Sequence, residues 1–257
     1  MPVSASNPLA PSSLDGKRAL VTGSSRGIGA DTATYFAEAG ARVVINYRNK
    51  EKRALQLVDK LAAAGGTAIA VGADLTDRSA VEAMMDRVRE EWGGLDILVL
   101  NASGGMESGV EADYALKLNR DAQVGVLDAA LPLLSQGSRV VFVTSHQAHF
   151  IETTPTMPEY EPVARSKRAG EDALRARIAE LQDKGVGFVV VSGDMIEGTV
   201  TATLLDRARP GAIDERKAAA GRLYNVSEFA AEVALAAVEP LPADNTRLVG
   251  DVSSFTD

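Results

Sequence analysis

The chain has 257 residues with a formal net charge of -8, and it contains two histidines and no cysteine. This length suits a single α/β domain with one buried core, and the acidic balance argues against nucleic-acid or anionic-membrane partners. Without cysteine the chain forms no disulfides, thiolate metal sites or cysteine nucleophile, so we expect no metal site and a cytoplasmic location.

Residues 1–14 (MPVSASNPLAPSSL) mix Ser, Pro and Ala, with neither the basic start nor the apolar run of an export signal. They predict a flexible N-terminal tail ahead of one domain that spans residues 15–257. No stretch of the sequence reaches the roughly 20 apolar residues that cross a bilayer, so we predict no membrane span.

From Lys17 onwards, short runs rich in Val, Ile and Leu alternate with longer segments of helical period. The runs predict strands at residues 18–23, 41–47, 67–73, 95–102, 138–145, 186–193 and 246–250. The segments between them predict helices at residues 27–39, 51–64, 78–92, 111–134, 163–184 and 227–238. Mostly continuous apolar strands are typical of a parallel sheet buried on both faces. We therefore predict a single-domain α/β fold, a Rossmann-like, doubly wound, seven-stranded parallel sheet with helices on both faces and a ligand crevice at the carboxyl ends of the strands.

The first predicted strand leads directly into TGSSRGIG (residues 22–29), which places Gly23, Gly27 and Gly29 in the turn before a helix. Glycine allows the positive φ of a tight turn and a close approach of the backbone to a pyrophosphate. The helix N-terminus adds unpaired N–H groups and a partial positive charge. Three glycines alone are weak support for a cofactor site, because ordinary turns also contain them.

Two further motifs make the glycine turn informative: DLTD follows the third predicted strand and NASGG follows the fourth. Together the three resemble the short-chain dehydrogenase/reductase family over nearly all of residues 14–250. The resemblance implies that the glycine turn holds the cofactor's pyrophosphate, the aspartate contacts adenine, and the asparagine supports the sheet and the cofactor. Ser103 departs from the family's pattern, because NASG stands where NAG is usual. The implied cofactor-binding residues are Gly23, Ser25, Arg26, Gly27, Ile28, Gly29, Asp74, Leu75, Asn101, Ala102 and Ser103.

The end of the second predicted strand bears on the choice of cofactor. An acid there would bind a ribose 2′-hydroxyl and repel a 2′-phosphate, but INYRNK has no acid before Glu51. Arg48 stands in that place, and with Arg26 it can clamp a 2′-phosphate, because guanidinium groups suit bidentate phosphate contacts. We therefore predict NADP(H) in preference to NAD(H), and the alternative for Arg48 is a solvated side chain on a loop.

The resemblance also implies a reacting centre for hydride transfer between a nicotinamide and a carbonyl or alcohol carbon. It assigns support of a proton-relaying water to Asn119, the substrate oxygen to Ser145, and stabilisation of a phenolate together with the nicotinamide ribose to Lys167. Taken alone, Ser145 could be a strand-end hydroxyl bonded to backbone and Lys167 a solvated helix residue. The prediction depends on their positions in combination.

The family's acid is where this chain departs from the pattern. The family motif YxxxK places a tyrosine four residues before the lysine, but Val163 stands there. Tyr160 is seven residues before Lys167 and precedes Pro162, which favours the first turn of a helix. We therefore expect Tyr160 in a loop that can carry the phenol into the site. Two alternatives stay open: His146, His149 or water supplies the proton, or the protein binds cofactor without turnover.

Downstream, SGDMIEGT (residues 192–199) replaces the family's Pro-Gly, and Thr199 is the candidate for a contact with the cofactor's phosphate. Residues 198–226 are expected to form a lid over the substrate. The sequence thus predicts an NADP(H)-dependent oxidoreductase, a ketoreductase acting on a small carbonyl or alcohol substrate. A nonenzymatic NADP-binding sensor or scaffold is the alternative. The resemblance further implies a homodimer or homotetramer formed through residues 111–134 and 163–184.

Overall fold

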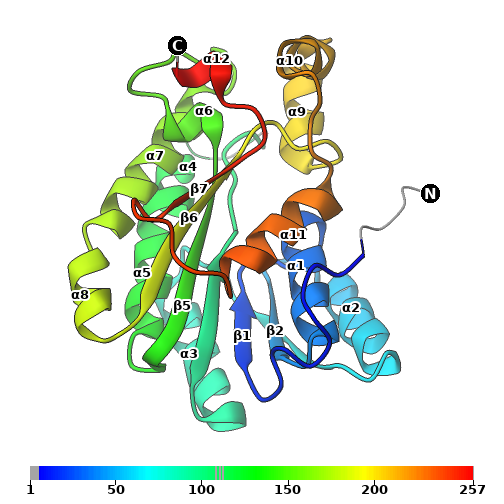
Figure 1. The fold of residues 1–257 in the computed structure, drawn as a ribbon, viewed down its shortest axis with the longest axis vertical. Helices are drawn as coiled ribbons and strands as arrows, with labels where there is room; N and C mark the ends of the chain where they lie inside the picture. The colour runs from blue at the N-terminus through cyan, green and yellow to red at the C-terminus, as the bar shows by residue number, and fades with distance from the viewer. Residues whose placement is uncertain (1–5, 108, 110, 112, 257) are drawn as a thin grey trace.

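Seven parallel strands form one sheet in the computed structural model, which describes residues 6–107, 109, 111 and 113–256 (Figure 1). The strand order is β3-β2-β1-β4-β5-β6-β7, so the order reverses between β1 and β4 and leaves a crevice at their carboxyl ends. The strands are β1 (Arg18–Val21), β2 (Arg42–Tyr47), β3 (Thr67–Gly72), β4 (Leu95–Leu100), β5 (Leu134–Ser145), β6 (Gly187–Gly193) and β7 (Thr246–Val249). The predicted seven-stranded, doubly wound parallel fold is confirmed.

Helices cover both faces of the sheet. One face carries α1 (Gly27–Glu38), α2 (Glu51–Ala63) and α11 (Val226–Ala236). The other carries α3 (Arg78–Trp92), α5 (Ala122–Ala130), α7 (Glu161–Arg175) and α8 (Ile178–Asp183). Along β5, Val141 and Val143 pack with the first group while Val140 and Phe142 pack with the second. This alternation explains why the strands are apolar throughout rather than at every second residue.

Local sequence sets several helix ends. The Asp77 carboxylate accepts hydrogen bonds from the backbone of Ser79 and Ala80 at the start of α3, and Gly93 ends that helix with a φ of 75°. Asn225 and Glu228 form a reciprocal capping box at the start of α11. These caps pair backbone groups that a helix end otherwise leaves open.

Two predicted helices are divided in the structure. The segment expected at 111–134, of which residue 112 lies outside the described residues, forms α4 (Tyr114–Leu116), the π-helical turn η1 (Lys117–Asp121) and α5, and β5 already begins at Leu134. The segment expected at 163–184 forms α7 and α8, with a break at residues 176–177. Gly170 of α7 lies against η1, where an added Cβ would be 2.0 Å from the Asn119 carbonyl oxygen. A π turn shifts the helix without ending its apolar pattern, so the sequence pattern does not reveal it.

Part of the predicted N-terminal tail is packed on the domain. Residues 1–5 lie outside the described residues. Leu9 and Leu14 are buried in the cluster with α1, and the Asn7 side chain donates a hydrogen bond to the Tyr35 carbonyl. The difference from the expected tail arises because these two leucines bury apolar surface that the composition of the segment does not suggest.

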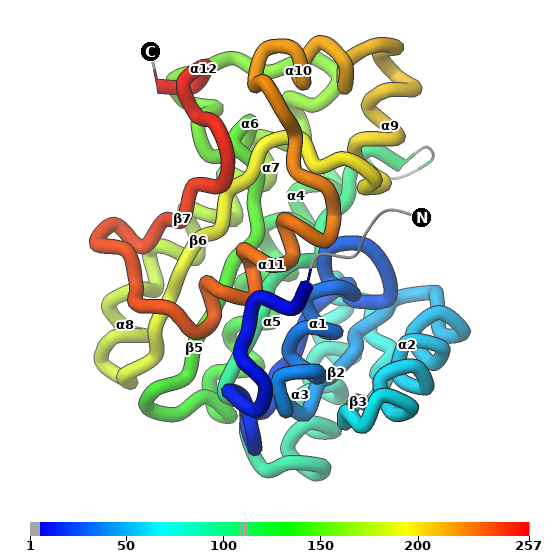
Figure 2. The backbone as a smooth tube through the Cα atoms, turned by 45° about the vertical axis from the view of Figure 1, so that its right-hand side comes forward, coloured from blue at the N-terminus to red at the C-terminus, as the bar shows by residue number. Residues whose placement is uncertain are grey.

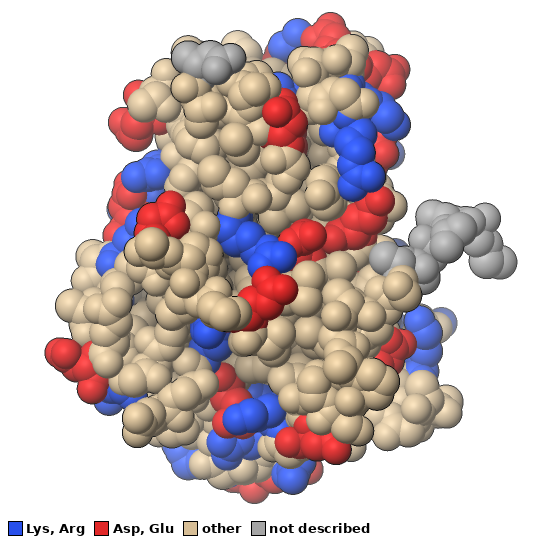
Figure 3. Space-filling model, in the orientation of Figure 1, with Lys and Arg blue, Asp and Glu red and all other residues tan. Residues whose placement is uncertain are grey.

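Four short helices stand beyond the carboxyl ends of the strands, as Figures 1 and 2 show. They are α6 (His146–His149), α9 (Val200–Ala208), α10 (Ala212–Ala220) and α12 (Ser253–Thr256). Figure 3 shows acidic and basic side chains mixed over one face of the molecule rather than gathered into a single basic area. Within the described ranges, no helix combines the length and apolar character needed to cross a membrane.

Candidate active site

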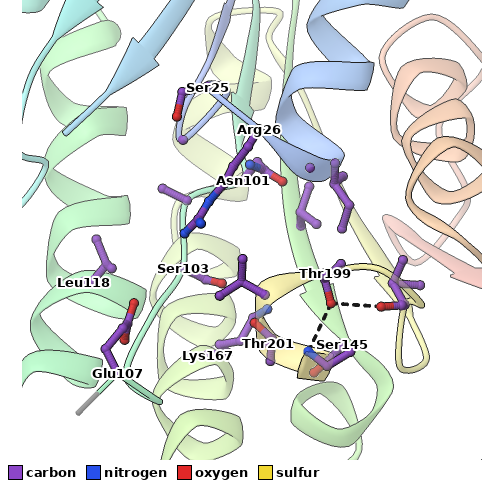
Figure 4. Close-up of a pocket in the computed structure, with 18 of the residues that line it drawn as sticks. Ser25, Arg26, Asn101, Ser103, Glu107, Leu118, Ser145, Lys167, Thr199 and Thr201 are labelled. Carbon is purple, nitrogen blue, oxygen red and sulfur yellow. Dashed lines mark hydrogen bonds between the residues drawn. The ribbon is translucent and has the colours of Figure 1, made fainter. Parts of the chain in front are cut away.

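A cavity of about 650 Å³ lies where the strands end, a size typical of small-molecule sites. Figure 4 shows Arg26 and Ser25 towards one end of it and Ser145 and Lys167 towards the other. Gly29 and Asn119 are the predicted site residues that do not line it. The predicted residues that do are Gly23, Ser25, Arg26, Gly27, Ile28, Arg48, Asp74, Leu75, Asn101, Ala102, Ser103, Ser145, Tyr160, Lys167 and Thr199.

The glycine turn has the geometry that an anion site requires. Gly23 and Gly27 have φ values of 64° and 60°, in the left-handed region that favours glycine. A Cβ at Gly29 would lie 2.7 Å from the Asn101 amide nitrogen, so this glycine lets α1 approach β4 closely. No side chain caps the N-terminus of α1, which leaves its first N–H groups available at the cavity. The turn therefore fits the pyrophosphate of a dinucleotide.

Basic side chains surround the cavity beyond β2. Arg26 and Arg48 line it as predicted, together with Lys50 and Arg53, which the sequence analysis did not single out. Lys50 immediately precedes α2 and Arg53 lies in its first turn, just after the end of β2. This place after a strand end could have identified both residues from the sequence. The first acid after β2 in the sequence, Glu51, accepts a hydrogen bond from the Tyr47 hydroxyl at 3.0 Å and is not part of the lining. This end of the cavity thus suits a phosphate better than a bare hydroxyl.

Arg48 also reaches across to the opposite wall. Its guanidinium donates a hydrogen bond to the Tyr114 hydroxyl and lies over the Tyr114 ring, 5.6 Å from its centroid. Two residues after the end of β3, the Asp74 carboxylate accepts hydrogen bonds from the backbone and hydroxyl of Thr76 at 3.0 and 2.8 Å, which fix its orientation at the cavity.

Three of the four predicted catalytic side chains, Ser145, Tyr160 and Lys167, line the same cavity. The Ser145 and Tyr160 hydroxyls lie 3.2 Å apart, and both residues are buried. Tyr160 directly precedes α7, and its backbone N–H donates to the Met157 carbonyl. Lys167 is 9% exposed and lines the same cavity, and no described residue forms a hydrogen bond or ion pair with its ammonium group.

Val163 has a packing role. It is 4% exposed, does not line the cavity, and lies so close to Gly105 that a Cβ there would be 3.2 Å from a Val163 methyl carbon. The position where the family carries tyrosine therefore faces a glycine loop in this chain. The phenol that faces Ser145 belongs to Tyr160.

The two histidines are turned away from the cavity. His146 is fully buried, with Nδ1 2.8 Å from the Ser192 hydroxyl and Nε2 3.1 Å from the Val249 carbonyl oxygen. His149 pairs with Glu171 of α7 at 2.8 Å. Neither imidazole lines the cavity, so the geometry does not support the alternative in which a histidine supplies the proton.

Burial lowers the pKa of His146 from 6.5 to about 4. The unfolded chain therefore binds more protons than the folded protein between these values, and the free energy of unfolding falls as the pH drops through this window. From this group we expect a loss of about 2 kcal/mol between about pH 7.5 and pH 5. Urea unfolding at both values measures it. His146→Asn should show a flatter dependence, and equal slopes for the two proteins would contradict the assignment.

Asn119 supports the site from η1. Its amide nitrogen donates to the Gly104 carbonyl and the Ser166 hydroxyl, both at 2.9 Å, and its amide oxygen accepts from the Gly104 N–H at 3.2 Å. The side chain thus joins the loop after β4 to α7, next to Lys167. In this position it holds other groups in place rather than lining the cavity.

Polar groups fix the segments that follow β6 at the cavity. The Thr199 hydroxyl donates to the Ile196 carbonyl at 2.9 Å and accepts from the Ala202 N–H at 3.2 Å, which caps α9 (Figure 4). The Asp194 carboxylate accepts hydrogen bonds from Gln147 and from Arg216 of α10. No sequence motif marks this last group.

The comparisons with known proteins agree with this geometry. The sequence model of short chain dehydrogenases matches residues 17–209. Versicolorin reductase of Emericella nidulans is 35% identical over 190 residues, which cover 72% of this chain and 70% of that protein. A short chain dehydrogenase from Burkholderia cenocepacia, solved in complex with NADP, has a TM-score of 0.78 and 30% identity over 92% of this chain and 97% of that chain. Landomycin C-6 ketoreductase LanV, solved with NADP and rabelomycin, has a TM-score of 0.74 and 25% identity over 91% of this chain and 95% of that chain. The chain therefore belongs to the short-chain dehydrogenase family.

Proposed function

We propose that the protein is an NADP(H)-dependent ketoreductase in which Tyr160 is the proton donor. The observation that carries the proposal is the 3.2 Å contact between the Tyr160 and Ser145 hydroxyls in the cavity that Lys167 also lines. A phenol beside Ser145 that comes from Tyr160 explains how the protein can lack the YxxxK spacing and still donate a proton to the substrate oxygen.

Each of the three side chains has a distinct task. Ser145 donates a hydrogen bond to the substrate oxygen and holds it beside the phenol. Tyr160 gives its proton to that oxygen as the carbonyl becomes an alcohol. The positive charge of Lys167 stabilises the phenolate that remains. Bound NADPH supplies the hydride.

The cofactor preference rests on charge. Four basic side chains line the cavity where a 2′-phosphate would lie: Arg26 in the turn after β1, and Arg48, Lys50 and Arg53 after β2. The NADP complexes of the Burkholderia dehydrogenase and of LanV support the same choice.

Replacing both Arg26 and Arg48 with alanine should raise the Kd for NADPH about 10- to 100-fold and change the Kd for NADH little. The lost contacts are charge-assisted hydrogen bonds to the phosphate that NADH lacks. Titration of nicotinamide fluorescence measures both constants without a substrate. Arg42→Ala, an exposed arginine at the opposite end of β2, is the matched control and should bind both cofactors as the wild type does. Parallel losses for NADPH and NADH would remove the basis of the preference.

We also propose that residues 198–226, with α9 and α10, form the lid over the substrate. Thr199, Ala202 and Leu205 of this segment line the cavity. The ion pair of Lys217 with Glu197 ties α10 to the base of the same segment.

Pairing of two or four chains through the outer surfaces of α5 and α7, and a cytoplasmic location, stay predictions. Light scattering tests the first, and the mass of one 27.0 kDa chain would contradict it.

Turnover separates the proposed function from a cofactor-binding sensor. We expect NADPH oxidation that depends on added ketone, measured over a panel that includes bicyclic aromatic ketones. The reductase names of relatives such as versicolorin reductase, and the rabelomycin complex of LanV, guide that choice. Tight NADPH binding without turnover on the whole panel would favour the sensor.

A further inference from the structure

A series of hydrogen bonds links Arg216 of the proposed lid, through Asp194, to Gln147 in the wall of the cavity. The Arg216 guanidinium of α10 donates to both Asp194 oxygens, at 2.9 and 2.7 Å, and lies over the Phe255 ring at 4.7 Å. The Asp194 carboxylate also accepts the Met195 N–H at 2.8 Å and the Gln147 amide nitrogen at 2.7 Å. Gln147 is 6% exposed and Asp194 9% exposed, and both line the cavity.

The hydrogen bond to Asp194 determines which way the Gln147 amide faces. A carboxylate only accepts hydrogen bonds, so the NH₂ end of the amide must point to Asp194 and the oxygen must point away from it. A reversed amide would place two acceptors 2.7 Å apart. No described residue donates a hydrogen bond to Oε1 of Gln147. The cavity therefore contains an oriented acceptor that no described residue pairs with, two residues from Ser145.

We propose that Oε1 of Gln147 accepts a hydrogen bond from a substrate hydroxyl, so that the protein selects hydroxylated ketones over the same ketones without the hydroxyl. The proposal rests on the ketoreductase function and adds the residue that determines its specificity. A bound substrate displaces water from this acceptor. A substrate without a donor leaves the acceptor unpaired, which weakens its binding relative to a substrate that supplies the hydrogen bond.

The surrounding wall indicates what carries that hydroxyl. Met157, Met195, Ile196 and Leu205 also line the cavity, and Met157, Met195 and Leu205 pack in one cluster. These side chains suit an apolar body, and methionine adapts to irregular shapes. A mainly apolar ketone with one well-placed hydroxyl group matches this lining. A polyanionic substrate does not.

The first variant for a test is Gln147→Met, which keeps the length of the side chain and removes the acceptor. The probes are α-tetralone and its phenolic hydroxytetralone isomers. For the wild type we expect kcat/KM to be about 10- to 100-fold higher for at least one hydroxytetralone than for tetralone. In Gln147→Met this ratio should fall to near 1, and the same loss should appear in the Kd of that hydroxytetralone for the NADP⁺-bound protein, where no reduction occurs.

Two further variants keep the result interpretable. Gln147→Asn retains an amide but withdraws it by one methylene, so it should also lose the preference if Gln147→Met does not fold. Gln136→Met makes the same exchange at an exposed position of β5 and should keep the wild-type ratio. A wild type that reduces tetralone and every hydroxytetralone equally well overturns the inference but leaves the ketoreductase function standing. A wild type that binds NADPH and reduces no ketone of the whole panel, the tetralones included, overturns both.

Discussion

Replacing Tyr160 with phenylalanine should lower kcat/KM for ketone reduction about 100- to 10,000-fold, the range that a positioned acid contributes. The variant keeps the ring that packs in the cluster with Met157 and removes only the hydroxyl that lies 3.2 Å from Ser145. The Kd for NADPH should change little, because the cofactor is held mainly by the glycine turn and the basic side chains. Single-turnover reduction and fluorescence titration measure the two quantities separately.

A second variant tests the position of the acid. Val163→Tyr restores the YxxxK spacing, but residue 163 is buried against Gly105 and does not line the cavity. Combined with Tyr160→Phe, it should therefore not restore activity. Wild-type rates in Tyr160→Phe would show that the phenol is not the acid. Recovery in the double variant would show that the usual family position can still operate.

Replacing Gly170 with alanine should lower the free energy of unfolding by about 1–3 kcal/mol and reduce activity as well. The added Cβ would lie 2.0 Å from the Asn119 carbonyl oxygen, and backbone cannot rotate away as a side chain can. Either α7 or η1 must move. Asn119 bonds to Gly104 and to Ser166, the neighbour of Lys167, so the movement reaches the site. Urea unfolding and kcat measure the two effects.

Gly125→Ala is the matched control for that change. Gly125 is also a helical glycine, in α5, and nothing lies within 4 Å of a Cβ built there. Alanine is a better helix former by about 1 kcal/mol, so this variant should be as stable as the wild type or more so. Equal stability of both variants would contradict the close packing of η1 on α7.

The sequence predicted the sheet well because its determinants are local. Continuous apolar runs identify buried parallel strands, and alternating helical segments impose the crossovers. The divided helices were missed because a π turn and a break near Arg177 interrupt hydrogen bonding without changing which residues are apolar. The side chain of Arg177 pairs with Asp128 of α5 and Glu180 of α8, contacts that no single segment reveals.

The same distinction applies to the candidate site. Glycine turns, the residues after strands and Lys167 are placed by elements that the sequence defines, and they line one cavity as expected. The position of Tyr160 depends on how residues 150–160 fold back, which is determined by tertiary packing. The hydrogen bond between Gln147 and Asp194 joins residues that are 47 positions apart and follow the ends of two different strands, β5 and β6. Neither spacing nor periodicity in the sequence could predict it.

The location of Tyr160 also bears on how the protein responds to heat. An acid on the first turns of α7 would keep its place until the helix melts, but Tyr160 lies at the end of the connection between α6 and α7. Such connections open locally at a lower free energy than the core elements they join. We therefore expect catalysis to be lost, as this segment opens, at a temperature below the one at which the sheet unfolds.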